Sequence, residues 1–244
     1  DEEGFVRGPS AGIRFDGVKM KAFDREQMDQ LIADQVRRVR GCLRLGYDAL
    51  TLHFGHDSLC GQFLSPVWNQ RTDEYGGSLE NRMRFPVEVI RALRKAMGEK
   101  YLLVVNAPNI GGPMGMDMDE AAAFLRAIDP YIDLLQVRGQ HPDHERVTVC
   151  ESAELSKGLK ARGVKTPIAI STYYKDLDSL NGVIASGAAD LVAPGHLFIC
   201  NEHLGEILRD GNGEDLNPAS SAMPAGHLRP RETWMSTAPS TRRS

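Results

Sequence analysis

Strand and helix patterns alternate strictly along most of this chain. Five short apolar runs are each followed by a longer segment whose apolar residues recur at helical spacing. Strands that are separated in this way by helices pair in parallel through right-handed crossovers. The sequence therefore predicts an α/β fold with a parallel sheet, whose strands are expected at residues 47–54, 101–106, 132–137, 166–171 and 189–194.

Capping residues place the helices between these strands. Asp24 is a typical N-cap for an amphipathic helix over 24–45, and Gly46 follows as its end signal. Ser78 has the same capping role before a helix over 79–97. The remaining helices are expected over 118–128, 151–163, 177–187 and 200–211.

Two architectures accommodate five strand–helix units. Eight units close a (β/α)8 barrel, which typically takes about 250 residues. Five units by themselves can form an open, doubly wound sheet with helices on both faces. Periodicity alone does not choose between a partial barrel and a doubly wound domain.

Composition restricts the class of function. Over 244 residues the net charge is -4, which gives no reason to expect binding to nucleic acid or to an anionic membrane surface. No apolar run approaches the roughly 20 residues that span a bilayer, and the acidic, polar start is unlike a signal peptide. The cysteines have neither metal-ligand nor disulfide spacing, so we expect no metal site and a reducing, cytoplasmic location. They are Cys42, Cys60, Cys150 and Cys200.

Two histidines three residues apart carry the first functional signal. His53 lies at the C-terminal end of the strand at 47–54, and His56 follows just beyond it. In parallel α/β folds, ligands bind at that edge of the sheet. Two imidazoles there are suited to donating hydrogen bonds to one substrate oxygen. The alternative is that both histidines only form hydrogen bonds with backbone groups.

A family resemblance begins directly after these histidines. Residues 62–94, QFLSPVWNQRTDEYGGSLENRMRFPVEVIRALR, resemble the signature of the Old Yellow Enzyme family of FMN-dependent NADH:flavin oxidoreductases, in its 2,4-dienoyl-CoA and 2-enoate reductase branch. Members of that family are TIM barrels in which the histidine strand is the fourth. The resemblance implies that residues 1–218 form strands 4–8 of a (β/α)8 barrel, truncated at its N-terminus.

The resemblance also implies an activity. Such an enzyme reduces the activated C=C bond of a small-molecule enoate or enoyl-CoA thioester, with FMN as cofactor and NAD(P)H as electron source. By resemblance, His53 and His56 are the catalytic residues that polarise the substrate carbonyl. The place of the family's proton-donating Tyr is taken here by Ser58, whose hydroxyl is a poor general acid near neutral pH.

The implied FMN contacts depart from the family pattern at three places. Asn106 stands where the family presents an Arg to the flavin, and Ser171 and Thr172 replace a Gly-Gly turn at the phosphate. Gly195-His196 replaces Gly-Arg, and a partly charged histidine is a weaker phosphate partner than arginine. Ser58, Asn106 and His196 favour an alternative from another class: a divergent, non-catalytic barrel that has lost flavin and serves as a scaffold or assembly partner. The intact pair of His53 and His56 opposes this alternative. Open strand edges also predict a homo-oligomer.

The last segment, 219–244, has no periodicity, and we expect a disordered tail. In the dienoyl-CoA reductase branch, closely spaced cysteines after the barrel hold a [4Fe–4S] cluster. An alanine codon preceded by T reads as cysteine in the neighbouring frame, and alanines stand at the corresponding places here: Ala219, Ala222, Ala225 and Ala238. We therefore expect a frame-shifted iron–sulfur segment, whose full-length parent carries the cluster and a downstream FAD/NADH domain.

Overall fold

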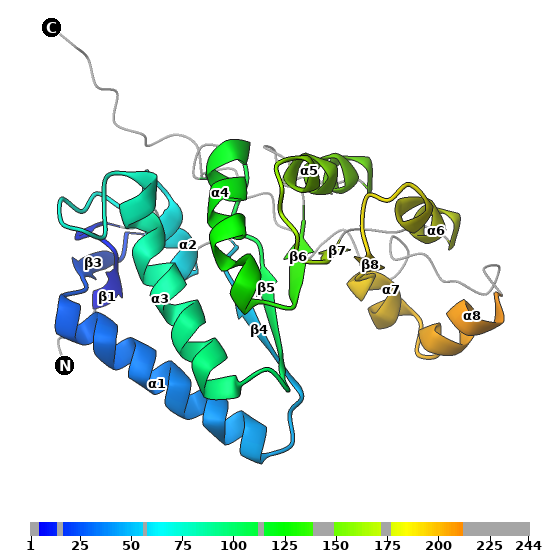
Figure 1. Cartoon of the computed structure of the whole chain (residues 1–244), viewed down its shortest axis with the longest axis horizontal. Helices are drawn as coiled ribbons and strands as arrows, with labels where there is room; N and C mark the ends of the chain where they lie inside the picture. Colours follow the sequence, from blue (N-terminus) through cyan, green and yellow to red (C-terminus); the bar gives the residue numbers. More distant parts are fainter. Residues whose placement is uncertain are drawn as a thin grey trace, which may run out of the picture.

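Five parallel strands form the centre of the fold. The computed structural model describes residues 5–13, 17–55, 58–111, 115–138, 149–171 and 177–211. The strands pair in chain order (Figure 1), as β4 (Ala49–His53), β5 (Leu102–Asn106), β6 (Leu134–Val137), β7 (Ile168–Ile170) and β8 (Leu191–Val192). In a doubly wound sheet the strand order reverses at a switch point. The unbroken order confirms the prediction of a partial (β/α)8 barrel.

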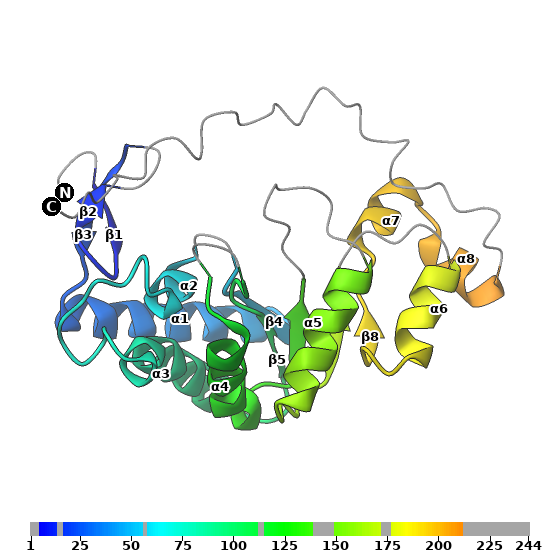
Figure 2. The same ribbon diagram turned by 90° about the horizontal axis from the view of Figure 1, so that it is seen from above.

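The helix that precedes β4 begins at its expected cap. α1 (Arg25–Arg44) begins after Asp24, whose carboxylate accepts a hydrogen bond from the Gln27 N–H, while the Gln27 side chain accepts one from the Asp24 N–H. This reciprocal pair is a capping box. The helices that follow lie in a row along one side of the sheet (Figure 2); they are α3 (Leu79–Met97), α4 (Met118–Ile128), α5 (Val149–Ala161) and α6 (Leu177–Ala185).

The two faces of the sheet differ in burial. The face toward the helices fully buries Leu103 and Val105. On the other face, which we call the open face, Thr51 is exposed and Leu102 keeps 52% of its surface accessible. A continuous apolar run at 101–106 predicts burial on both faces. That prediction is wrong for Leu102, because five strands do not close around a lumen.

The helical elements beyond the crossovers differ from the sequence prediction in two places. α2 (Leu59–Leu64) lies within a segment expected to be a loop. The helix expected over 200–211 starts earlier and is divided into α7 (Gly195–Cys200) and α8 (Leu204–Asp210). The division occurs because Asn201 takes an extended conformation, while its side-chain amide donates to the α7 backbone instead of continuing the helix.

A small sheet that the sequence patterns did not predict precedes the barrel elements. It consists of β1 (Phe5–Gly8), β2 (Gly12–Ile13) and β3 (Lys19–Ala22), with β3 in the middle. Arg71, in the loop of the family signature, connects the barrel to this sheet. Its Nη1 donates to the carbonyls of Pro9 at 2.8 Å and Phe23 at 2.7 Å, and the rest of the guanidinium bonds Asp73. This one side chain thus fixes the C-terminal ends of the parallel strands β1 and β3 to the loop.

The signature loop is shaped by its own side chains. The Nδ2 of buried Asn69 donates to the carbonyls of Phe63 at 2.8 Å and Tyr75 at 2.7 Å, and its Oδ1 accepts from the Arg71 N–H at 3.2 Å. A Cβ at Gly76 would lie 2.2 Å from the Arg71 carbonyl oxygen, so only glycine fits there. Much of the string that carries the family resemblance therefore serves loop architecture.

Residues 212–244 lie outside the described part of the chain. The boundary at 218 and the disordered or frame-shifted tail at 219–244 therefore remain predictions. Among the described residues, no helix is both long and apolar enough to cross a bilayer. The small N-terminal sheet and α8 lie at opposite ends of the molecule (Figures 1 and 2).

Candidate active site

Three polar side chains share the open face at the carboxyl ends of β4, β5 and β6. The register pairs His53 with Asn106, and Asn106 with Gln136. Residues paired across parallel strands lie on the same face, so the three form a polar row at the ligand-binding edge of a barrel. Gln136 was missed at the sequence level. Its signal was an amide within the otherwise apolar stretch LLQV, on the face that it shares with Asn106.

His53 and Asn106 are in direct contact. Asn106 Nδ2 lies 3.1 Å from His53 Nδ1. A Cβ at Gly55 would lie 3.2 Å from His53 Cε1, so the imidazole ring sits close over the Gly55 backbone. Asn106 Oδ1 is buried and has no hydrogen-bond partner among the described residues. A buried acceptor without a donor costs free energy, and a donor on a bound group would remove that cost.

The structure describes Ser58, at the expected proton-donor position, but not His56, the second expected donor. His56 lies outside the described residues, so its convergence with His53 stays a prediction. Ser58 is the N-cap of α2, where its Oγ accepts from the Gly61 N–H at 3.2 Å. A Cβ at Gly61 would lie 2.4 Å from the Phe54 carbonyl oxygen, so this turn is tightly packed. Ser58 therefore has a structural role in starting α2.

The expected phosphate contacts lie at the carboxyl ends of β7 and β8. The Ser171 N–H donates to the Val137 carbonyl at 2.9 Å, and the Gly195 N–H donates to the Ala193 carbonyl at 3.0 Å. Both backbone donors are thus engaged within the fold, which leaves the Ser171 hydroxyl and the following first-turn N–H groups of α7 as candidates. A Cβ at Gly195 would meet no atom within 4 Å, so the packing does not require glycine there.

Two of the residues that we predict to bind the cofactor, Thr172 and His196, lack a described side chain. Thr172 and the side chain of His196 lie outside the described residues, and their roles at a phosphate stay predictions. Within the described ranges, no three His, Cys, Asp or Glu side chains come together in a way that could hold a metal ion.

A cavity of about 250 Å³ lies beside the polar row, between β4 and the helices α1, α2 and α3. His53 and Thr51 line one side of it, and apolar side chains such as Phe85 line the other. Cys60 also lines this cavity, and burial raises the pKa of its thiol to about 12. The thiol therefore stays protonated and unreactive at neutral pH.

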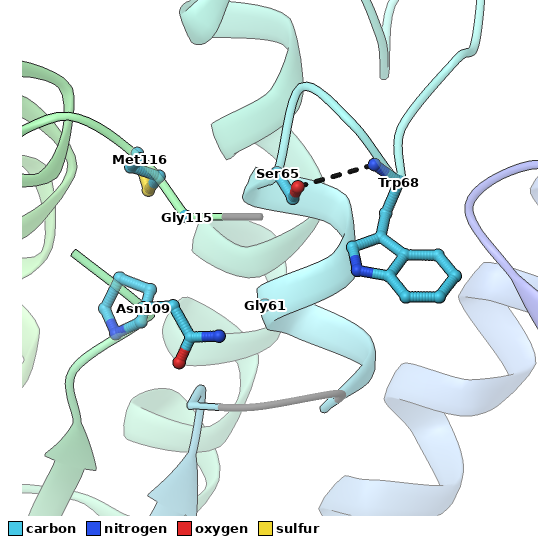
Figure 3. A pocket seen from close by; sticks show the side chains of 7 residues that line it. Gly61, Ser65, Trp68, Asn109, Gly115 and Met116 are labelled. Carbon is cyan, nitrogen blue, oxygen red and sulfur yellow. Dashed lines mark hydrogen bonds between the residues drawn. The ribbon is translucent and has the colours of Figure 1, made fainter. Parts of the chain in front are cut away.

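A second, smaller space separates α2 from the loop after β5 (Figure 3). Its volume is about 10 Å³, which is about the size of a single water molecule. Ser65 and Trp68 lie on one side of it, with the Ser65 Oγ accepting from the Trp68 N–H at 3.4 Å, and Asn109 and Met116 lie on the other. It is too small to hold a substrate.

Comparison with known proteins identifies the family to which this chain belongs. The model of the NADH:flavin oxidoreductase / NADH oxidase family matches residues 6–213. An NADPH dehydrogenase of Clostridium acetobutylicum is 30% identical over 187 residues, which cover 75% of this chain and 55% of that protein. The 12-oxophytodienoate reductase 1 of Oryza sativa subsp. japonica is 33% identical over 197 residues, which cover 76% of this chain and 50% of that protein. The chain thus spans about half the length of these relatives.

The solved structures agree on the fold. A complex of 2-naphthoyl-CoA reductase with 2-naphthoyl-CoA superposes with a TM-score of 0.77 at 24% identity, covering 86% of this chain and 33% of that chain. The family match spans both the signature loop and the polar row. The chain therefore belongs to the NADH:flavin oxidoreductase / NADH oxidase family, which confirms the resemblance to the Old Yellow Enzyme family.

Proposed function

We propose that this chain forms the substrate-polarising half of an FMN-dependent oxidoreductase that takes its electrons from NAD(P)H and reduces the activated C=C bond of an enoate or enoyl thioester. The observation that carries the proposal is the contact between His53 and Asn106 on the open face, at the edge where barrel enzymes bind their substrates. A relative named as a reductase of 12-oxophytodienoate supports the substrate class.

The described residues fit a flavin in part. The buried Oδ1 of Asn106 is an acceptor that a flavin N–H could satisfy, and the Ser171 hydroxyl stands at the end of β7, where the family binds phosphate. With Thr172, Gly195 and His196, these residues are the ones we propose to hold FMN. Once bound there, FMN supplies the hydride that a C=C reduction requires.

The protein's own contribution is polarisation of the substrate. A ring N–H of His53 donates to the carbonyl oxygen conjugated with the C=C bond, and we propose His56 as the second donor. Two preorganised donors stabilise the negative charge that develops on that oxygen. Closure of the barrel over the open face would exclude water and strengthen both hydrogen bonds.

The proton that completes the reduction comes from another source than Ser58 in this proposal. Its hydroxyl oxygen already accepts the capping hydrogen bond from Gly61, and an aliphatic hydroxyl is a poor general acid near neutral pH. Solvent or a group on the strands that complete the barrel would then supply the proton.

The test compares this chain with a polypeptide that carries the complete barrel. We expect the complete protein to purify with the visible absorbance of flavin and to oxidise NAD(P)H in the presence of an enoate. The chain by itself should be weakly active or inactive and should self-associate, because β4 and β8 have open edges. Turnover by this chain alone at ordinary enzyme rates, on the order of 10 per second, would contradict the requirement for the other strands.

A non-catalytic scaffold remains the second candidate. It is favoured by the engaged N–H groups of Ser171 and Gly195, which reduce the number of backbone donors for a phosphate. A complete protein that is folded, carries no flavin and takes none up when FMN is added would support this candidate over the enzyme.

We further propose that the tail at 219–244 is a frame-shifted iron–sulfur segment and that a full-length parent carries a [4Fe–4S] cluster and an FAD domain. The nucleotide sequence around Pro218 tests this proposal. Codons ending in T before Ala219, Ala222 and Ala225 would support it, and any other base at those positions would end it.

A further inference from the structure

We propose that Asn106 is a positioning residue that holds His53 as the neutral imidazole with its single proton on Nε2. The proposal concerns the ring itself and holds with or without a cofactor. Its consequence for catalysis rests on the proposed function, in which a His53 N–H donates to the substrate oxygen.

The contact arises from strand register. His53 and Asn106 are direct partners across parallel β4 and β5, so their side chains leave the sheet side by side on the open face. The short Asn side chain ends beside the ring, with Nδ2 3.1 Å from Nδ1. The contact therefore follows from the register and from the short side chain of Asn106.

The direction of the hydrogen bond decides the tautomer. An amide NH2 group can only donate, so Nδ1 of His53 must present its lone pair. The neutral ring then carries its one proton on Nε2. The other side of the ring is restricted by the Gly55 backbone, because a Cβ at that residue would already lie 3.2 Å from Cε1 and 3.6 Å from Nε2. The ring is thus held from both sides.

The same geometry explains why the buried side-chain oxygen of Asn106 has no hydrogen-bond donor among the described residues. With Nδ2 directed at His53, Oδ1 is turned away from the ring and is left buried without a donor among the described residues. The reversed amide would give Oδ1 a donor at Nδ1–H and would place the ring proton on the wrong nitrogen. One amide thus positions the histidine and offers an acceptor to a bound group.

The experiment measures the tautomer directly. The chain is labelled with 15N-histidine, and long-range 1H–15N correlation spectra are recorded at about pH 8, well above the ordinary histidine pKa of about 6.5. The spectrum of His53→Gln assigns the signal. We expect Nε2–H in the wild-type chain, and Nδ1–H in Asn106→Asp, because a carboxylate can only accept.

The control is Gln136→Glu, which adds the same charge to the polar row on a strand that does not pair with β4. It should leave the His53 tautomer unchanged. An Nδ1–H signal in the wild-type chain would overturn the proposal by showing that the amide is reversed. An unchanged Nε2–H signal in Asn106→Asp would overturn it by showing that the two side chains are not in contact. A failure to bind flavin would by itself contradict the proposed function, but it would not contradict the assignment of the His53 tautomer.

Discussion

Asn69→Ala should be among the most destabilising single changes in the signature loop. The substitution removes three hydrogen bonds and leaves two buried carbonyls, those of Phe63 and Tyr75, without their donor. At a net value of about 1 kcal/mol for each hydrogen bond, the loss is about 3 kcal/mol, which corresponds to roughly 150-fold in the unfolding equilibrium. Desolvated carbonyls that stay unpaired would raise this figure.

The assay is equilibrium unfolding in urea, followed by intrinsic fluorescence. With an m-value of about 2 kcal/mol/M, the midpoint should fall by about 1.5 M. Thr72→Ala is the matched control, since this side chain is exposed in the same loop and its loss should change stability by less than about 0.5 kcal/mol. If the two variants unfold at the same urea concentration, the loop does not depend on the Asn69 hydrogen bonds and the structural interpretation of the family signature is wrong.

Four further outcomes are expected. Arg71→Lys should release the small N-terminal sheet, seen as faster proteolysis there, because an ammonium group cannot reach both carbonyls and the carboxylate at once; equal cleavage rates would contradict this. In native protein an aromatic disulfide reagent at pH 8 should modify exposed Cys150 and spare Cys60, whose pKa burial raises to about 12, until the chain unfolds. The backbone hydrogen bond from Ile168 and the nearby Lys160 ammonium lower the pKa of Asp190, so its stabilisation is present above the ordinary Asp pKa of about 3.9 and is lost as pH falls further; Asp190→Ala should therefore cost most at neutral pH and least below about pH 4. In the complete protein, Ser58→Tyr restores the family's tyrosine, and it should speed flavin reoxidation by the substrate if the absence of that tyrosine makes substrate protonation rate-limiting. The same substitution should weaken α2 by about 1 kcal/mol, because the N-cap hydroxyl of Ser58 is lost.

The sequence predicted the helices and strands of the barrel part because the signals for them are local, and the family resemblance chose the barrel over a doubly wound sheet. Asp24 and Ser78 both cap helices as their residue types suggested, and the apolar runs became strands in chain order. What the patterns missed depends on contacts distant in sequence. The N-terminal sheet is held by Arg71, which is more than forty residues away in the sequence. The strands of this sheet are too short to show a periodicity that would predict them.

The sequence predicted which residues lie at the candidate site better than it predicted what each side chain contacts there. The position of His53 at a strand end followed from the pattern, and the family resemblance supplied the role that we propose for it. The Asn106 contact required the register of β4 and β5, which alternation alone does not determine. The capping role of Ser58 required the start of α2, a helix of six residues that is too short for its periodicity to be recognised.

The most direct test of the central claim separates the two half-reactions in the complete protein. Anaerobic stopped-flow absorbance would follow flavin reduction by NAD(P)H and then flavin reoxidation by an enoate, in the wild type, in His53→Ala and in the open-face control Thr51→Ala. We predict that His53→Ala slows reoxidation by roughly 10²-fold or more and leaves reduction unchanged, as expected for the loss of one donor to a developing oxyanion, while Thr51→Ala affects neither step. Reoxidation by the enoate at the wild-type rate in His53→Ala would contradict the assignment of His53 to the substrate carbonyl.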